Sequence, residues 1–222
     1  VNVAPSLTAG GTASYSEGSP AVVVDGTLTI TDPDSANLAS ATVELTTNFV
    51  SGQDVLSFAD TANIAGTYSA ATGVLQLVGT DTLANYQAAL RTVRYVNTSN
   101  TPSELPRTVR WTASDGIATS SPVTSTVNVA ASDDPPVAVA DAATVNEDSG
   151  ATALTVLSND TDPDGGPISL SSVTQPSNGT VVITGGGTGL TYTPNANYCN
   201  TPPGIALDTF TYTLTPGGST TT

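Results

Sequence analysis

Three aspartates at alternate positions form the part of this chain best suited to metal chemistry. Asp160, Asp162 and Asp164 alternate within Asn-Asp-Thr-Asp-Pro-Asp-Gly at residues 159–165. Carboxylates this close repel one another, so one must take up a proton or a cation must neutralise them. Ca²⁺ accepts many oxygen ligands in flexible geometry, and a short acidic loop supplies several of them. The spacing therefore predicts a calcium-binding loop.

A second acidic segment, Ser-Asp-Asp-Pro-Pro at residues 132–136, precedes that loop. Proline fixes φ and pushes the residue before it toward extended conformations. The segment therefore predicts a short, stiff linker, with Asp133 and Asp134 as further candidate calcium ligands.

An internal repeat relates the two halves of the chain. Glu147 lies 130 residues after Glu17, and Asp162 lies 130 residues after Asp32 within a second Thr-Asp-Pro-Asp sequence. A period of this length predicts two similar domains in tandem. We expect a first domain over residues 1–131, the linker over 132–136 and a second domain over 137–222, whose last strand the sequence truncates.

The charge balance excludes several classes of partner. Four Lys and Arg stand against 19 Asp and Glu, for a net charge of −15, and all four cations are arginines before residue 111. Nucleic-acid binding needs basic clusters, and anionic membrane surfaces repel such a chain. Neither partner is expected, and no apolar segment is long enough for membrane insertion.

Catalysis has little support in these residues. The chain has no His, so a Ser-His-Asp arrangement is absent and nothing activates the single Cys199, whose role stays open. Zinc is equally disfavoured. A glycosidase needs two acids across a cleft, whereas these acids cluster in turns. We expect no enzyme. Trp111 and the tyrosines are expected to pack in the core or at its rim rather than to form a sugar-binding platform.

Short Val- and Thr-rich runs separated by Gly, Pro, Asn or Asp predict strands throughout the chain. A different period appears at residues 82–90, where the apolar spacing predicts a short helix capped by Thr82 or Asp81. Scattered acids such as Asp25 and Asp54 are expected to be solvated surface charges. Strands are expected at residues 21–30, 41–50, 55–59, 74–78, 92–97, 107–112, 123–129, 137–145, 153–157, 168–173, 180–184, 190–193 and 209–214, with another beginning at 219–222.

These patterns together resemble the cadherin-like superfamily. Glu17, then residues 30–34, 113–116 and 133–136 follow the order of calcium ligands in a cadherin repeat. Residues 145–148, 157–165, 178–180, 192–198 and 208–212 are more similar to the bacterial cadherin-like and VCBS-type repeats of large surface adhesins. The D-R-E segment of the family has no clear counterpart, with Asp81 the nearest candidate. The resemblance implies an all-β fold of two tandem Ig/cadherin-like Greek-key β-sandwiches.

The resemblance also implies a ligand set for Ca²⁺. Glu17, Asp133 and Asp134 would share calcium with Asp160, Asp162 and Asp164 at the domain junction. Asp32, Asp34 and Asp115 would serve an equivalent site toward a preceding domain.

The function expected is that of a calcium-rigidified tandem module in a bacterial cell-surface or secreted adhesin, acting in adhesion or as a spacer. Its partners would be neighbouring domains of a longer chain, homotypic contacts or polysaccharide, in an extracellular location. Two alternatives stay open, namely a carbohydrate-binding module and the subunit of a surface filament assembled by strand exchange.

Overall fold

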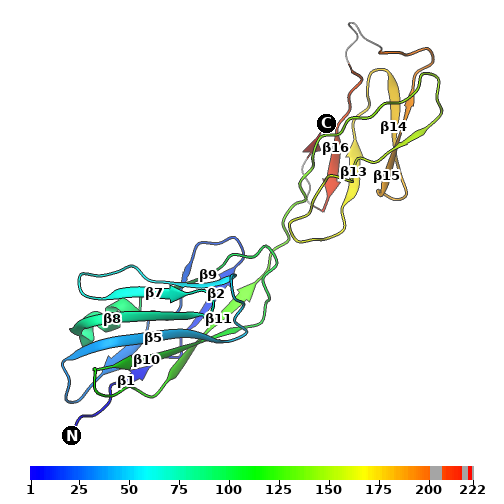
Figure 1. Ribbon diagram of the computed structural model, residues 1–222. Coiled ribbons are helices and arrows are strands. Elements are labelled where there is room, and N and C mark those ends of the chain that lie inside the picture. The colour runs from blue at the N-terminus through cyan, green and yellow to red at the C-terminus, as the bar shows by residue number, and fades with distance from the viewer. Residues whose placement is uncertain (201–206, 217–219, 222) are drawn as a thin grey trace. The chain divides into compact units, whose positions relative to one another are not determined.

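The chain divides into two compact units, Val1–Ser132 (unit 1) and Asp133–Thr222 (unit 2). The computed structural model describes residues 1–200, 207–216 and 220–221 (Figure 1). Strands make up both units, and α1 (Leu83–Leu90) is the single helix among the residues described. The predicted all-β fold class is confirmed.

A six-stranded sheet forms one layer of unit 1, in the order β2-β11-β10-β5-β8-β7. The smaller sheets are β3-β9-β6 and the pair β1-β4. All pairs are antiparallel except β11 with β2, which run parallel with Thr126 opposite Thr12 and Ala130 opposite Ser16. The strands are β1 (Ser6–Thr8), β2 (Thr12–Ser16), β3 (Val22–Val23), β4 (Thr29–Thr31), β5 (Asn37–Thr47), β6 (Asp54–Ser57), β7 (Ala65–Ser69), β8 (Val74–Thr82), β9 (Arg94–Asn97), β10 (Arg107–Ser114) and β11 (Val123–Ala130).

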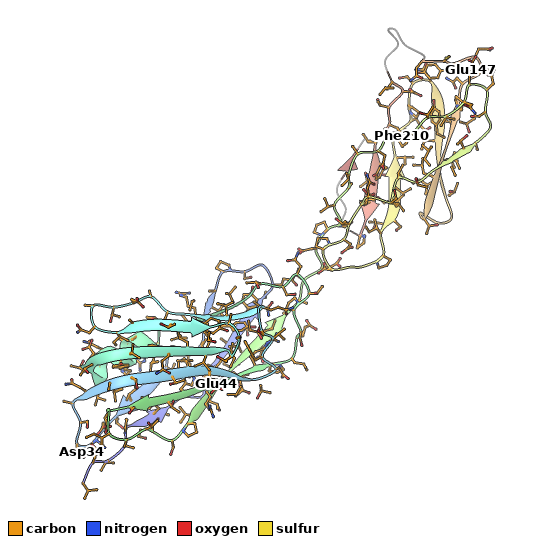
Figure 2. All side chains as sticks on the ribbon, in the orientation of Figure 1. Asp34, Glu44, Glu147 and Phe210 are labelled. Atoms are coloured by element: carbon orange, nitrogen blue, oxygen red, sulfur yellow. The ribbon has the colours of Figure 1, made fainter. Side chains whose placement is uncertain are left out.

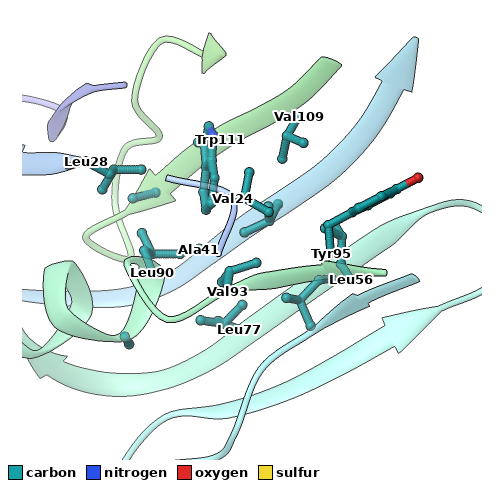
Figure 3. Close-up of a cluster of buried hydrophobic side chains, with 14 of the residues drawn as sticks. Val24, Leu28, Ala41, Leu56, Leu77, Leu90, Val93, Tyr95, Val109 and Trp111 are labelled. Atoms are coloured by element: carbon teal, nitrogen blue, oxygen red, sulfur yellow. The ribbon is translucent and has the colours of Figure 1, made fainter. Parts of the chain in front are cut away.

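The core of unit 1 lies between the large sheet and the smaller ones. Val109 and Trp111 project into it from β10, and Leu56 and Tyr95 project from β6 and β9 (Figure 3). Alternate residues of a strand face opposite sides, so the Val-x-Trp pattern of β10 places both side chains inward. Each fully buried side chain of this size stabilises the fold by about 1.5–3 kcal/mol.

The predicted helix is confirmed as α1. Thr82 is its N-cap, and its Oγ1 accepts a hydrogen bond from the Asn85 amide at 3.2 Å. Tyr86 and Leu90 are buried against the core, because residues four apart share one helix face. Among the described residues, no helix has the length and apolar character needed to cross a membrane.

Unit 2 contains two three-stranded sheets, β12-β15-β14 and β13-β16-β17. Its core is smaller and consists of Val156, Leu170, Val181, Leu190, Tyr212 and Leu214. The strands are β12 (Thr152–Leu154), β13 (Ser169–Val173), β14 (Gly179–Thr184), β15 (Gly189–Pro194), β16 (Tyr212–Thr215) and β17 (Thr220–Thr221).

Several predicted strands differ from the structure, and the one expected at 153–157 is observed only as Thr152–Leu154. The run at 21–30 is divided into β3 and β4 because the chain turns around Asp25. The strand at 137–145 is wrong, since only an isolated bridge joins Val137 to Thr161. The strand at 209–214 begins only at Tyr212. Of the segment expected at 219–222, Ser219 and Thr222 lie outside the described residues.

Candidate calcium-binding loops

The acidic loop of unit 2 is a tight turn closed by its own side chains. Asp162 Oδ1 accepts a hydrogen bond from the Asp164 amide at 2.9 Å, and Gly165 follows with a φ of 72°. Glycine adopts such a φ without the steric cost of a Cβ, which explains the residue after the third aspartate. Asp162 Oδ2 has no hydrogen-bond partner in the described part of the chain. The loop therefore presents an unpaired carboxylate oxygen.

Asp134 is attached to this loop from the linker. Its backbone amide donates a hydrogen bond to the Asp164 carboxylate. A main-chain donor thus holds Asp164 in place. The Asp134 side chain adds a second carboxylate oxygen within 4.8 Å of the first, although the two residues are 30 apart in sequence. This contact brings together two of the residues predicted to bind calcium.

Asp160 lies apart from Asp162 and Asp164, although the sequence grouped all three. Its side chain is 9% exposed and turns into the core, where Oδ1 accepts from the Val139 amide at 2.8 Å. Both carboxylate oxygens also lie 3.2 Å from the Tyr212 hydroxyl. The structure gives Asp160 a part in the core of unit 2, and its role as a calcium ligand stays a prediction.

The same turn occurs in unit 1 at the position expected from the repeat. Asp32 Oδ1 accepts from the amides of Asp34 and Ser35 at 3.1 and 3.0 Å. Asp32 Oδ2 is closed to water and has no hydrogen-bond partner within the described residues. The two Asp-Pro-Asp turns therefore leave the same oxygen unpaired.

Asp115 lies close to this turn through the first residues of the chain. Its Oδ2 accepts from Asn2 Nδ2 at 2.8 Å, and the amide of Val3, the next residue, donates to the Asp34 carboxylate. Hydrogen bonds from the Ala118 amide, the Asn2 side chain and the Ile117 amide lower the pKa of Asp115 below its usual range. The carboxylate is therefore ionised at neutral pH and available to a cation.

Glu17 and Asp133 complete the predicted ligand set. Glu17 Oε2 accepts from the Ser132 amide at 2.8 Å, so the side chain lies where unit 1 ends. Asp133 is exposed. Within either unit alone, no three carboxylates of the described chain have oxygens within 4.8 Å of one another. A cation held by one unit would therefore also need carbonyl or water oxygens.

Asp25, expected to be a solvated surface charge, is 2% exposed instead. It accepts hydrogen bonds from the Gly11 amide at 2.8 Å, both donors of Thr27, and the Ser125 hydroxyl at 2.7 Å. Burial alone would raise the pKa of Asp25, but these donors together hold it well below its usual range. Asp25 is an internal structural anion.

Asp54 is also buried, contrary to the sequence prediction, and forms an ion pair with Arg107 at 3.3 Å. Both side chains are fully buried. Asn97 Nδ2 and the Tyr95 hydroxyl donate to Asp54 Oδ1, and the Val50 amide donates to Oδ2. Burial, followed by the Asp54 carboxylate, raises the pKa of Tyr95 far above its usual range. The network connects β6, β9 and β10 inside the core.

The only tryptophan is unavailable as a sugar-binding platform. Trp111 is fully buried, and its Nε1–H donates to Ser125 Oγ at 3.0 Å. Exposed aromatic faces are what a polysaccharide site would need. The expectation that Trp111 packs in the core is confirmed.

Comparison with known proteins identifies the second unit. The model of the bacterial Ig domain family matches residues 133–222. Unit 2 is therefore similar to bacterial Ig domains over its whole length. The chain is also 39% identical over 101 residues to halomucin from Haloquadratum walsbyi. The aligned region covers 43% of this chain and 1% of halomucin. The chain therefore spans a very small part of that relative.

Two solved structures show weaker likeness. The match to the protocadherin gammaB4 extracellular domain covers 95% of this chain and 30% of the protocadherin chain, with 17% identity and a TM-score of 0.37. The match to an endo-fucoidan hydrolase of glycoside hydrolase family 107 covers 97% of this chain and 27% of the hydrolase chain, with 12% identity and a TM-score of 0.27. Similarity at these scores indicates no function for this chain.

Proposed function

We propose that this chain is a calcium-binding, calcium-rigidified tandem module of a bacterial surface or secreted protein. Its role would be adhesion or the spacing of other domains. The observation that carries the proposal is the repeated Asp-Pro-Asp turn, in which one oxygen of Asp32 and one of Asp162 have no hydrogen-bond partner among the residues that the structure describes. An unpaired, ionised oxygen is costly unless a cation or water satisfies it.

The chemistry of the donors fits calcium rather than a transition metal. All candidate ligands are carboxylates, together with the carbonyls of their turns, and hard cations prefer such oxygen donors. Bound calcium would neutralise the repulsion among Asp133, Asp134, Asp162 and Asp164. The linker would then lose conformational freedom, because charge repulsion would no longer favour extended and variable arrangements of these residues.

An extracellular location is part of the same proposal. The bacterial Ig domain match and the likeness to halomucin support a repeat within a larger surface protein. Extracellular modules typically bind calcium with dissociation constants of about 10⁻⁴–10⁻³ M. Neighbouring repeats would be the first partners of such a module.

Calorimetric titration of the chain with calcium tests the proposal. We expect a dissociation constant of about 10⁻⁴–10⁻³ M. Asp162→Asn should weaken it at least about tenfold, because a ligand charge is removed while the turn-closing oxygen remains. Asp60→Asn is the matched control, since Asp60 is exposed and also accepts an amide hydrogen bond, from Gly66 at 2.8 Å.

Small-angle scattering separates binding from stiffening. With calcium the distribution of interatomic distances should narrow, and chelation should broaden it again. Absence of binding, or equal losses in both variants, would contradict the calcium site. Binding with unchanged scattering would refute only the stiffening.

A further inference from the structure

A side chain closes the free edge of β14 in unit 2. β14 is the last strand of the sheet β12-β15-β14, with β15 on one side of it (Figure 1). On the other side, the Gln175 side-chain amide donates to the Val181 carbonyl at 2.9 Å and accepts from the Val181 amide at 2.9 Å. A neighbouring strand would form these same two hydrogen bonds with Val181. Gln175 thus takes the place of a strand at one residue of the edge.

Ile183 extends the same edge. Main-chain groups of alternate residues point to the same side of a strand, so those of Ile183 face away from β15 like those of Val181. Val182 lies between them, opposite Thr191 of β15, and its side chain is 51% exposed. The edge therefore offers two pairing positions on either side of an exposed valine, and Gln175 occupies one of them.

The sequence around β14 carries no charge that would repel a second copy. Residues 165–207 contain no Asp, Glu, Lys or Arg, although the chain has a net charge of −15. The acids of unit 2, such as Glu147 (labelled in Figure 2), belong to segments before residue 165 or to Asp208. Gly-Thr-Val-Val-Ile-Thr of β14 combines β-branched residues with no charge and no proline. Segments of this composition pair readily with identical segments.

Unit 1 closes a free edge in a different way. β7 is the last strand of the six-stranded sheet, and its Gly66 amide donates to Asp60 Oδ1 at 2.8 Å. Two copies meeting at β7 would bring their Asp60 carboxylates together, and charged side chains of this kind protect sheet edges from pairing. Gln175 is neutral, so a strand can replace it without burying an ion. Of these two edges, β14 is the one suited to pairing.

We propose that β14 pairs with β14 of a second copy of this chain, and that the Gln175 side chain is a latch that the second copy displaces. In an antiparallel arrangement centred on Val182, Val181 of each copy exchanges main-chain hydrogen bonds with Ile183 of the other. The two Val182 side chains then lie directly opposite each other, and such β-branched pairs stabilise a sheet. Both copies use the same surface, so the contact is closed and ends at a dimer.

The pairing gives the proposed surface module a homotypic partner, but it is independent of calcium. Residues 165–207 contain none of the candidate calcium ligands. Association measured in the presence of a chelator therefore tests the pairing alone, whatever the outcome of the calcium titration. One strand pair buries less than the roughly 1,200 Å² of a stable interface, so the parent chain should dimerise only weakly.

Sedimentation velocity of the full chain with chelator, over a concentration series, compares the parent with Gln175→Ala. A hydrogen bond of about 1 kcal/mol changes an equilibrium about fivefold, and each copy of the parent gives up two of them. Removal of the latch should therefore lower the dimer dissociation constant at least about tenfold, and the mass should stop at that of a dimer. Gln53→Ala, at a half-buried glutamine of unit 1, is the control and should associate like the parent.

A charge at the centre of the contact should reverse this effect. Val182→Glu added to Gln175→Ala places two carboxylates directly opposite each other, which destabilises a strand pair and should restore the monomer. Val78→Glu added to Gln175→Ala is the matched control, because Val78 is 49% exposed on β8 of unit 1. This second double variant should still dimerise.

Hydrogen exchange followed by NMR locates the contact. In Gln175→Ala the Val181 amide should exchange rapidly at low concentration and become protected as the dimer forms, whereas protection of the Tyr212 amide in β16 shows that unit 2 stays folded. Gln175→Ser, whose side chain is too short to bond both groups of Val181, replaces Gln175→Ala if the alanine opens unit 2. A monomer at every concentration, growth past a dimer, or a dimer that survives Val182→Glu would each overturn the proposal.

Discussion

Units 1 and 2 repeat one plan, yet a nearly equivalent segment forms a strand in one and none in the other. Thr12–Ser16 is β2 in unit 1 because β11 lies beside it in parallel. Residues 142–146 of unit 2 have a similar alternation, but they line a hollow and belong to no strand of the described residues. The alternation of such a segment alone therefore does not decide whether it forms a strand, because pairing with a neighbour also contributes.

The two units also differ in how they bury charge. Unit 1 encloses Asp25 with hydroxyl and amide donors alone, and it pairs Asp54 with Arg107. Unit 2 has no basic side chain and buries Asp160 beside a tyrosine hydroxyl. Substitution of one residue in each arrangement, followed by measurement of the stability of each unit, shows which unit depends on that arrangement. Trp111 is the only tryptophan and lies in the core of unit 1, so its fluorescence reports that unit alone.

The largest effect is expected for Arg107→Leu in unit 1. Removing the cation leaves the fully buried Asp54 without its ion-pair partner, which should cost about 3–5 kcal/mol. Urea denaturation followed by Trp111 fluorescence measures the loss. Arg110→Leu is the control, because Arg110 pairs with Glu44 at the surface and should cost at most about 1 kcal/mol. Equal losses would show that burial of the pair is unimportant.

A smaller effect that depends on pH is expected for Asp25→Asn. The amide cannot accept from all the donors around it, so unit 1 should lose about 2 kcal/mol at neutral pH. The folded pKa of Asp25 lies below its unfolded value of about 3.9, so the ionised form stabilises the fold above that pH. This stabilisation is lost as the pH falls through the folded pKa.

Denaturation of the parent and Asp25→Asn at several pH values checks that sign. The difference in unfolding free energy should be constant from neutral pH down to about 5 and shrink below about 4. Asp60→Asn, at an exposed turn, should show little difference at any pH. A difference that grows on acidification would contradict the assigned role of Asp25.

Much of the fold could be predicted because its signals are local. The period of residues 82–90 and the capping threonine identified α1, and β13, β14 and β15 lie close to the predicted ranges. The ion pair could not be predicted this way, since Asp54 and Arg107 are 53 residues apart in sequence. A lone acid before an apolar strand has the same appearance whether it is solvated or paired in the core.

The candidate site shows the same limit. The Asp-Pro-Asp turns follow from the chemistry of their residues, and in both turns the first aspartate accepts a hydrogen bond from an amide of the loop. The inward rotation of Asp160 depends on Val139 and Tyr212, which are distant in sequence. Alternate spacing alone treats Asp160, Asp162 and Asp164 as equivalent, whereas only Asp160 lies in the core.

The smallest effect is expected for Tyr212→Phe in unit 2. The hydroxyl lies 2.9 Å from Asp141 Oδ2, 3.2 Å from both oxygens of Asp160 and 3.1 Å from the carbonyls of Val139 and Val156. One proton serves all of these acceptors in turn, and burial together with Asp141 strongly raises the pKa of Tyr212. Asp160 retains the Val139 amide, so the loss should be about 1 kcal/mol.

Hydrogen exchange of the β13 and β16 amides measures this loss, which should increase their exchange about fivefold if exchange follows unfolding of unit 2. The Trp111 transition should stay unchanged, because Tyr212 belongs to the other core. Tyr68→Phe removes a hydroxyl that donates to the Asp54 carbonyl in unit 1. It should destabilise unit 1 in the Trp111 transition and leave the exchange of the β13 and β16 amides unchanged. If either variant changed both readouts, the two units would unfold together, and the stability of each core could not be varied independently of the other.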